Sequence, residues 1–290
     1  MSRPPVALTI AGSDPSGGAG IQADLKTFSA LGAYGTAVIT ALTAQNTRGV
    51  TGVHVVPADF VAEQLQTLTA DVRIDAVKIG MLATAEIADA VGDFLRAFAG
   101  DVVVLDPVMV ATSGDRLLAP DAAAAVARLV PLASIITPNL HEAADLLGVP
   151  VATDLAEVRT QAEALLASGA KRVLLKGGHL ANAGDGTARA VDVLAESVGA
   201  GVELTELTAP RIATRNTHGT GCTLSSAIAA LRPQRGSWPD AVREAKQWLT
   251  AALAAADTLA VGGNGRDGDA GPGEGHGPVH HFHALWPTLG

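Results

Sequence analysis

Residues 216–223 read Asn216-Thr217-His218-Gly219-Thr220-Gly221-Cys222-Thr223, and an Ala-rich segment of helical period follows them. This order predicts a sharp glycine turn that opens a helix over Cys222–Leu231, with the chain's one cysteine in the first turn. The first turn of a helix has N–H groups without intrahelical partners, beside the positive end of the macrodipole. The stretch therefore indicates a phosphate-binding turn. The structural alternative is an ordinary loop followed by a cysteine that only packs.

Outward from this turn, short runs rich in Val, Ile and Leu alternate with segments of helical period. This alternation is typical of βαβ units and predicts an α/β fold with a mainly parallel central sheet flanked by helices. The expected strands are Val6–Ala11, Thr36–Thr40, Gly52–Val56, Ala76–Ile79, Val102–Leu105, Ile135–Thr137, Val173–Lys176, Ala188–Leu194 and Val202–Thr208. The expected helices are Ile21–Leu31, Ala58–Thr69, Ala85–Phe98, Pro120–Val130, His141–Leu147, Leu155–Ala167, Cys222–Leu231 and Asp240–Leu259.

Composition limits the classes of protein that this chain can belong to. With 290 residues, 48% hydrophobic and 17% charged, one domain over residues 1–290 with an aliphatic core is expected. A net charge of −9 argues against binding to nucleic acid or to an anionic membrane. A single cysteine, no signal peptide and no apolar run near 20 residues predict a cytoplasmic protein. The Gly-rich segment Gly262–Gly277 is expected to form a flexible surface loop.

Polar residues follow several expected strands at their carboxyl ends, where α/β proteins bind ligands. They are the Gly12–Gly20 loop, Asp106, Asn139 with Glu142, and Lys176. Gly12–Gly20 has neither the lysine of a Walker A loop nor the acidic partner of a dinucleotide site. Its small residues and Asp14 instead indicate a loop that approaches a bound small molecule.

The segment around Asn139 has two interpretations. Asn139 and Glu142 have the spacing of a capping box at a helix start. Alternatively, Glu142, with Asp106 as a second carboxylate, holds Mg²⁺ mostly through water, as that ion prefers. Lys176 is either a point charge directed into the site or a solvated lysine. Gln45 has the donor and acceptor needed for an aminopyrimidine edge, or is an exposed amide in a turn.

Taken together, the motifs resemble the ribokinase-like superfamily and, more narrowly, the hydroxymethylpyrimidine/phosphomethylpyrimidine kinases of thiamine biosynthesis. The similarity covers nearly the whole chain. The stretches that carry it are Thr9–Asp24, Thr40–Thr47, Val77–Leu82, Asp106–Met109, Thr137–Glu142, Lys176–His179, Thr217–Ser225 and Gly277–Phe282. The resemblance implies a three-layer α/β/α fold and a homodimer. It also implies transfer of the γ-phosphoryl group of ATP, with Mg²⁺, first to 4-amino-5-hydroxymethyl-2-methylpyrimidine and then to its monophosphate.

The resemblance also implies a role for individual residues. Gly219, Thr220, Gly221 and Cys222 would form the anion hole, and Lys176 would stabilise phosphoryl charge. Thr217 and Asn139 would serve the nucleotide, with Glu142 and Asp106 organising Mg²⁺. The residues expected at the pyrimidine are Gly12, Asp24, Gln45, Met81 and Val108.

Cys222 occupies the place where most relatives in this superfamily have an aspartate base. Because helix N-termini lower the pKa of cysteine, we expect that the Cys222 thiol can take the hydroxyl proton. A neutral thiol would also tolerate a second substrate that is already phosphorylated, which an aspartate would repel. The alternatives that remain are a pyridoxal, pyridoxine or pyridoxamine kinase, and a pyrimidine-binding sensor without catalysis.

Overall fold

The computed structural model describes residues 3–98, 100–108, 120–178, 180, 189–199, 201–262 and 276–286. Their strands form one large sheet and one hairpin. The strands are β1 Val6–Ala11, β2 Tyr34–Ile39, β3 Ala41–Asn46, β4 Gly49–Val55, β5 Ala76–Ile79, β6 Val103–Leu105, β7 Ile135–Ile136, β8 Arg172–Leu175, β9 Arg189–Val198 and β10 Gly201–Pro210. The α-helices are α1 Gly20–Ala30, α2 Ala58–Thr69, α3 Ala85–Ala97, α4 Pro120–Ala127, α5 Leu140–Leu147, α6 Leu155–Ala167, α7 Thr220–Leu231 and α8 Trp238–Ala254.

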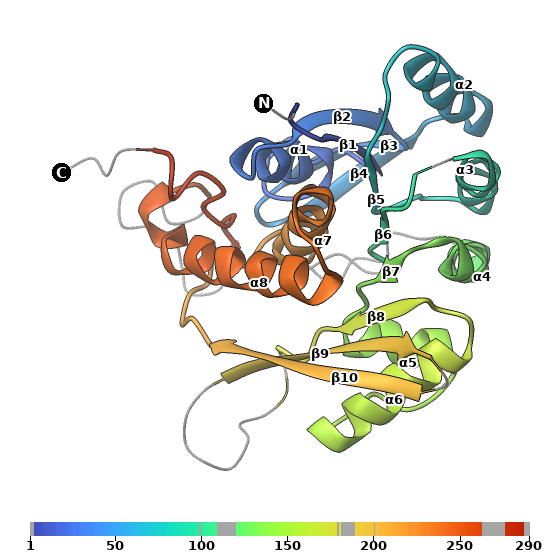
Figure 1. Ribbon diagram of the computed structural model, residues 1–290. Coiled ribbons are helices and arrows are strands. Elements are labelled where there is room, and N and C mark those ends of the chain that lie inside the picture. Colours follow the sequence, from blue (N-terminus) through green and yellow to red (C-terminus); the bar gives the residue numbers. More distant parts are fainter. Residues whose placement is uncertain are drawn as a thin grey trace.

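The large sheet has the order β10-β9-β8-β7-β6-β5-β1-β2. Pairing is parallel from β8 through β2 and antiparallel between β8 and β9 and between β9 and β10. Helices α1, α7 and α8 cover one face, and α2 to α6 cover the other (Figure 1). The expected three-layer α/β/α fold with a mainly parallel sheet is therefore confirmed.

Two aliphatic cores hold the layers together, one on each face of the sheet. One core joins strand residues such as Ile10 and Ile79 to α2 to α6, and the other joins Val104 and Leu174 to α7 and α8. Burying each such side chain stabilises the fold by roughly 1.5–3 kcal/mol. Because both faces are covered, the central strands are mostly apolar, and most of the polar residues follow the strand ends; Thr9 in β1 and Lys78 in β5 are buried exceptions.

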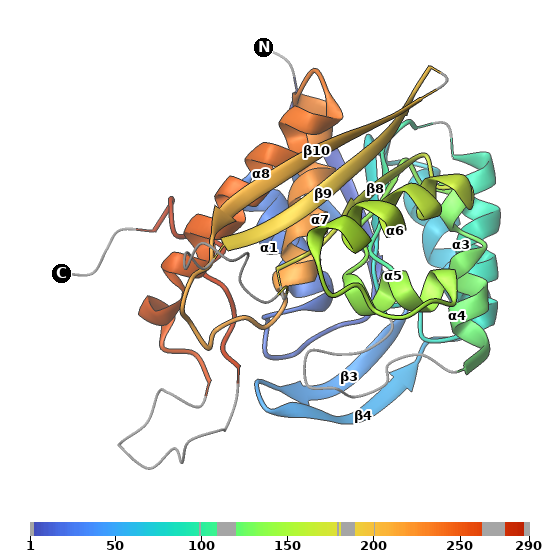
Figure 2. The same cartoon turned by 90° about the horizontal axis from the view of Figure 1, so that it is seen from below.

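The hairpin β3–β4 differs from the sequence-based expectation. A strand over Thr36–Thr40 and then a turn were expected, but the chain forms β2, breaks at Thr40 and continues as β3, which pairs antiparallel with β4. Figure 2 shows this hairpin beside one end of the main sheet. β3 reads Ala-Leu-Thr-Ala-Gln-Asn, with one large apolar residue, so it resembles a turn until β4 supplies the ladder. Gln45 therefore lies on a strand, and the interpretation as an exposed turn amide is wrong.

Other boundaries moved by a few residues. β9 and β10 form longer strands than expected, and α8 ends at Ala254, where a 3₁₀ turn over Ala256–Leu259 continues. Helix α7 begins at Thr220, two residues before the expected start. Most of the Gly262–Gly277 segment lies outside the described residues, as do Met109 and His179.

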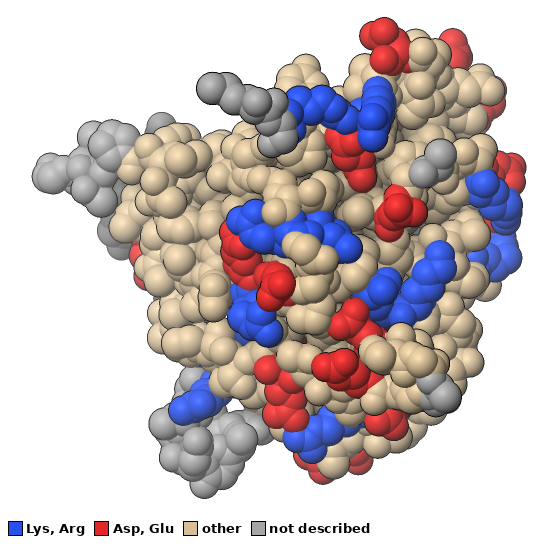
Figure 3. Space-filling view, in the orientation of Figure 1, with Lys and Arg blue, Asp and Glu red and all other residues tan. Residues whose placement is uncertain are grey.

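The surface visible in Figure 3 carries basic and acidic side chains side by side, without a continuous basic area. This mixture accompanies a net charge of −9. Within the described part of the chain, no helix combines the length and apolar character needed to cross a bilayer.

Candidate active site

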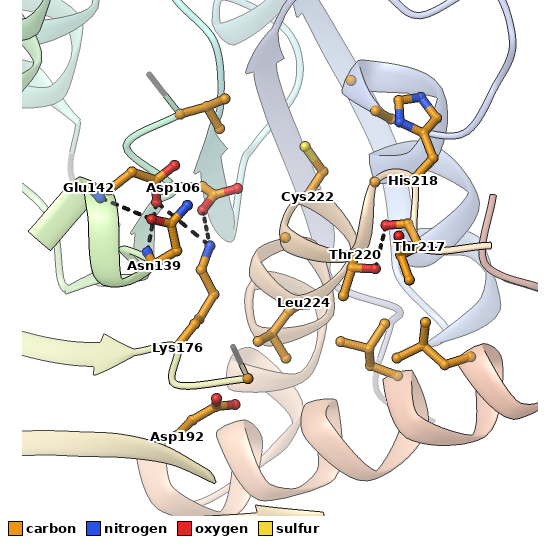
Figure 4. Close-up of a pocket in the computed structure, with 18 of the residues that line it drawn as sticks. Asp106, Asn139, Glu142, Lys176, Asp192, Thr217, His218, Thr220, Cys222 and Leu224 are labelled. Carbon is orange, nitrogen blue, oxygen red and sulfur yellow. Dashed lines mark hydrogen bonds and ion pairs between the residues drawn. The ribbon is translucent and has the colours of Figure 1, made fainter. Parts of the chain in front are cut away.

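The carboxyl ends of the parallel strands open into a cavity of about 900 Å³. Figure 4 shows side chains from two groups of elements facing each other across it: Asp106, Asn139, Glu142 and Lys176 on one side, Cys222, Thr217, Thr220 and His218 on the other. Every site residue expected from the sequence lines this cavity except Asp24. The expected residues that line it are Gly12, Gln45, Met81, Asp106, Val108, Asn139, Glu142, Lys176, Thr217, Gly219, Thr220, Gly221 and Cys222.

The glycine turn has a geometry that only glycine fits. Gly219 caps α7 in the left-handed region, with φ of 75° and ψ of 11°. A Cβ built on Gly219 would lie 1.7 Å from the carbonyl oxygen of Gly18. A side chain is therefore excluded both by the backbone angles and by this contact. Thr220 Oγ1 donates to the carbonyl of Thr217 at 2.6 Å and stabilises the turn. The first N–H groups of a twelve-residue helix therefore face the cavity.

Gly221 opens this turn toward the charged side of the cavity. A Cβ on Gly221 would lie 3.3 Å from Lys176 Nζ and 3.8 Å from Asp106 Oδ2. An anion at the start of α7 would therefore lie close to the Lys176 ammonium group. Two sources of positive potential, one from the helix and one from a side chain, converge on the same space.

Lys176 follows β8 and is held by two carboxylates. Its Nζ donates to Asp106 Oδ1 at 2.9 Å and lies 4.0 Å from Glu142 Oε2. Burial alone would lower the pKa of Lys176, but these carboxylates raise it above its usual value. Burial alone would raise the pKa of Asp106. The Lys176 and Lys78 ammonium groups outweigh burial, so the pKa of Asp106 lies below its usual value. The site therefore carries a fixed ammonium group among fixed carboxylates at neutral pH.

Asn139 and Glu142 do form a capping box on α5. Asn139 Oδ1 accepts from Glu142 N at 2.9 Å, and Glu142 Oε2 accepts from Asn139 N at 2.7 Å. The same Glu142 oxygen is the one that approaches Lys176. The two interpretations of this motif are therefore compatible, because the cap fixes a carboxylate at the cavity wall.

Cys222 contradicts one expectation. Its half-buried thiol lies at the cavity, and burial raises the pKa of Cys222 to about 11 despite the opposing effect of Lys78. The expected lowering of the Cys222 pKa is therefore wrong, because loss of hydration, with the Asp24 and Asp106 carboxylates, outweighs the effect of the Lys78 ammonium group. At neutral pH the thiol is therefore protonated, and transfer of the hydroxyl proton to Cys222 stays a prediction.

Asp24 is the expected substrate residue that the structure does not bring to the cavity. It is fully buried, and its carboxylate accepts from Lys78 Nζ at 2.9 Å, Thr9 Oγ1 at 2.6 Å and Ser226 Oγ at 2.6 Å. These partners use the carboxylate to join α1, β1, β5 and α7. Asp24 therefore acts as an internal tie beneath the site.

Lys78 is a residue that the sequence reasoning missed. It lies on β5 with no exposed surface, yet it lines the cavity floor. Burial alone would lower the pKa of Lys78, but Asp24, Cys222 and Asp106 raise it above its usual value. The signal was a lysine inside the apolar run Ala76–Ile79, because a lysine in a buried strand requires a partner.

Replacing Lys78 with methionine is expected to destabilise the fold by about 3–5 kcal/mol, because the Asp24 carboxylate would remain buried without its cation. Adding Asp24→Asn to Lys78→Met is expected to recover much of that loss, since no charge would then remain at the tie. Urea unfolding of the wild type, both single variants and the double variant measures the difference. A double variant as unstable as the sum of the single ones would contradict this account.

Apart from Asp24, the residues expected at the pyrimidine gather at one end of the cavity. A Cβ on Gly12 would lie 2.5 Å from Met81 Cε, so Gly12 leaves room for that side chain. Gln45 Oε1 accepts from Thr43 Oγ1 at 3.1 Å, which orients the amide. Val108 lines the same cavity after β6. An apolar floor and a fixed amide are suited to a planar ring with a polar edge.

The other end of the cavity is more apolar and was not foreseen. Its wall comes from the segment after β10, from α7 and from one face of α8. The side chains that form it are Ile212, Leu224, Leu249, Thr250 and Leu253. A purine base fits such a wall. No sequence motif marks this wall, because its residues on α8 have the spacing of ordinary core positions in a helix.

Known proteins were compared with this chain. A sequence profile of the family described as phosphomethylpyrimidine kinase matches residues 14–268. The hydroxymethylpyrimidine/phosphomethylpyrimidine kinase of Escherichia coli (strain K12) is 56% identical over 281 residues, which cover 97% of this chain and 98% of that protein.

Solved structures agree with this relationship. The crystal structure of phosphomethylpyrimidine kinase from Clostridium difficile 630 has a TM-score of 0.72 at 40% identity and covers 86% of this chain and 99% of its own. The pyridoxal kinase of Staphylococcus aureus, in complex with AMP-PCP and pyridoxal, has a TM-score of 0.81 at 31% identity and covers 98% and 96%. On sequence, fold and the residues gathered at the cavity, the chain belongs to the phosphomethylpyrimidine kinase family.

Proposed function

We propose that this chain is a hydroxymethylpyrimidine and phosphomethylpyrimidine kinase of thiamine biosynthesis. It transfers the γ-phosphoryl group of ATP to the hydroxymethyl group of 4-amino-5-hydroxymethyl-2-methylpyrimidine, and a second one to the resulting monophosphate. The observation that carries the proposal is the glycine turn of α7 facing Lys176, between the Gln45 end and the apolar end of one cavity. The names of the relatives support the same activity.

The geometry supports catalysis by positioning and by charge. Phosphoryl transfer has a loose transition state, so a protein contributes chiefly alignment and stabilisation of the equatorial oxygens. The N–H groups after Gly219 and the Lys176 ammonium group would take those roles, with Thr217 and Thr220 fixing the turn. The protonated Cys222 thiol would stand beside the acceptor without adding charge.

The residues present also fit Mg²⁺. Asp106 and Glu142 are oxygen donors of the kind this ion prefers, and both lie within 4.0 Å of Lys176 Nζ. No group of three or more His, Cys, Asp or Glu side chains with metal-binding geometry exists among the described residues. An ion held mostly through water and nucleotide phosphates agrees with this sparse set. Bound there, Mg²⁺ would supply charge neutralisation to the phosphates.

A vitamin B6 kinase is the second candidate, because the Staphylococcus aureus neighbour carries pyridoxal in a similar fold. Gln45 favours the pyrimidine, since its amide matches an aminopyrimidine edge with both a donor and an acceptor. Incubation with ATP, MgCl₂ and either hydroxymethylpyrimidine or pyridoxal, followed by mass spectrometry, tests the assignment. Pyrimidine mono- and diphosphate are expected. Pyridoxal phosphate as the only product would identify the chain as a vitamin B6 kinase. No product from either acceptor would favour a pyrimidine-binding sensor without catalysis.

Replacing Lys176 with methionine is expected to lower kcat by about 100–1000-fold in both phosphorylations, because the transition state loses a preorganised cation. KM for the pyrimidine should change little, since the ring is expected at Gln45 and Met81 and not at Lys176. Steady-state kinetics with each acceptor measures kcat and KM separately, and thermal unfolding checks that the variant is folded. Lys171→Met, an exposed lysine just before β8, is the matched control and should retain activity. A Lys176→Met enzyme with wild-type kcat would remove Lys176 from the mechanism.

We also infer a cytoplasmic homodimer, because ATP is the phosphoryl donor and the hairpin exposes apolar side chains. Val53 and Val55 on β4 are 47% and 38% exposed, and they share one face of the hairpin because their ladder partners are Thr43 and Ala41. A two-stranded hairpin is marginal without cover, and a second copy would supply it.

Val53→Ser with Val55→Ser is therefore expected to convert the dimer to a monomer in light scattering coupled to gel filtration. Val202→Ser, an equally exposed apolar residue on β10, is the control and should leave the mass unchanged. A wild-type protein of monomer mass, or a double variant that keeps the dimer mass, would refute this interface.

A further inference from the structure

Asp14 organises the Gly12–Gly20 loop, although its side chain is 1% exposed. Its carboxylate accepts from Ser16 N at 2.9 Å, Ala19 N at 2.8 Å and Gly18 N at 3.2 Å. Ala19 is the N-cap of α1 and has no side chain to cap that helix. Asp14 therefore fixes the loop up to the N-cap residue of α1, by binding the N–H groups of Gly18 and Ala19.

The same carboxylate reaches the phosphate-binding turn. Asp14 Oδ2 lies 2.7 Å from His218 Nε2, across 204 residues of sequence, and both side chains line the cavity. Burial raises the pKa of Asp14, but hydrogen bonds from His218 and Ser16 outweigh it and lower the pKa. Asp14 is therefore a carboxylate at neutral pH, and His218 Nε2 is the donor.

The loop and the turn also touch through their backbones. A Cβ on Gly18 would lie 2.4 Å from His218 Cδ2, and one on Gly219 would lie 1.7 Å from Gly18 O. Neither glycine could therefore carry a side chain without displacing the other segment. His218 immediately precedes Gly219, so the side chain that bonds Asp14 is attached to the turn itself.

On its other side, the loop is bonded to the hairpin that carries Gln45. Thr43 N donates to Ser13 Oγ at 3.2 Å, and Thr43 Oγ1 lies 2.9 Å from Ser13 O and 3.1 Å from Gln45 Oε1. Ser13 is the neighbour of Asp14. Hydrogen bonds and single peptide links therefore connect Gln45 to Gly219 without interruption.

We propose that His218 is a positioning residue that, through Asp14, couples the pyrimidine end of the cavity to the phosphate-binding turn. This inference rests on the proposed kinase function. Binding of the pyrimidine at Gln45 orders the Ser13–Asp14 corner, and this corner orders the turn through His218. By reciprocity, a nucleotide at the turn strengthens pyrimidine binding by the same factor.

Titration calorimetry tests the coupling directly. A non-hydrolysable ATP analogue with MgCl₂ is titrated into the enzyme without and with saturating hydroxymethylpyrimidine, and the pyrimidine is titrated without and with the analogue. In the wild type each ligand is expected to tighten the other by about 10-fold, within the usual range for coupled sites. His218→Phe is expected to bring this factor close to one while each ligand still binds alone.

Further variants separate positioning from loss of folding. His218→Gln can present an amide N–H toward Asp14 and is expected to restore coupling at least partly. Asp14→Asn is expected to reduce it. Asp75→Asn is the matched control, because Asp75 also accepts a backbone N–H, from Val6, and contacts an arginine at the opposite end of β1. That control should keep the wild-type factor.

The outcomes distinguish this inference from the assigned function. A wild-type enzyme without coupling, or a His218→Phe variant that keeps it, would overturn the role of His218 even if both phosphorylations proceed. A folded wild-type protein that neither binds the pyrimidine nor forms phosphorylated product would overturn the function itself.

Discussion

Replacing Gly219 with alanine is expected to lower kcat for both phosphorylations by about 100–1000-fold, the usual effect of losing an oxyanion-hole donor. An alanine at φ of 75° is strained, and its Cβ would lie 1.7 Å from Gly18 O. The turn can relieve this contact only by moving away from the loop, which moves the first N–H groups of α7 out of line with Lys176. Single-turnover measurement with hydroxymethylpyrimidine and with its monophosphate reports the loss in each chemical step.

Gly148 supplies the control for backbone strain alone. It ends α5 with φ of 67°, and a Cβ there would meet nothing within 4 Å. Gly148→Ala should therefore lower stability by roughly 1–2 kcal/mol and leave kcat near the wild-type value. A Gly219→Ala enzyme with more than a tenth of wild-type kcat would show that the turn is not the phosphate site.

The difference between Gly219 and Gly148 also shows what the sequence can predict. A glycine after a predicted strand or before a predicted helix indicates a turn, and the turn at Gly219 was expected on that basis. The contact with Gly18 joins segments about 200 residues apart. Such a contact depends on how α1 and α7 pack together, and local patterns carry no information about it.

The fold itself was largely predictable, because buried parallel strands require continuous apolar runs and their helices require a 3.6-residue period. The hairpin β3–β4 was missed as a unit, since Ala41–Asn46 has few branched apolar residues and depends on β4 for its ladder. The bounds of β9 and β10 shifted for a similar reason: each strand is extended by pairing with the other over ten residues, which the local sequence does not show.

In the site, residue types were easier to predict than their electrostatics. Lys176, Asp106 and Glu142 were expected at one edge of the sheet, and they meet there. The raised pKa of Cys222 and the Lys78–Asp24 tie both depend on burial. The extent of that burial is set by the packing of distant segments, so it could not be judged from local sequence. The assignment of Asp24 to the substrate came from a resemblance, whereas its three buried partners give it a structural role.

Replacing Cys222 with aspartate is expected to separate the two phosphorylations. The wild-type thiol is neutral, because burial raises the pKa of Cys222 to about 11. A carboxylate there would stand near the acceptor, which is uncharged in the first step and a phosphate in the second. Two like charges about 4 Å apart repel by about 4 kcal/mol at an effective dielectric constant of about 20, which corresponds to roughly 1000-fold. Lys176 and Lys78 offset part of this repulsion, so kcat/KM for the monophosphate should fall about 100-fold more than for hydroxymethylpyrimidine.

Cys222→Ser is the matched control, because it keeps a small neutral side chain at the start of α7. Its ratio of kcat/KM for the two acceptors should stay close to the wild-type ratio, whatever its absolute activity. The comparison of ratios removes any general damage to folding or to ATP binding, since both acceptors share one enzyme and one donor. Equal losses with both acceptors in Cys222→Asp would mean that the charge at this position does not reach the acceptor phosphate. A neutral residue at Cys222 would then require a different explanation, such as packing against the Lys78–Asp24 tie.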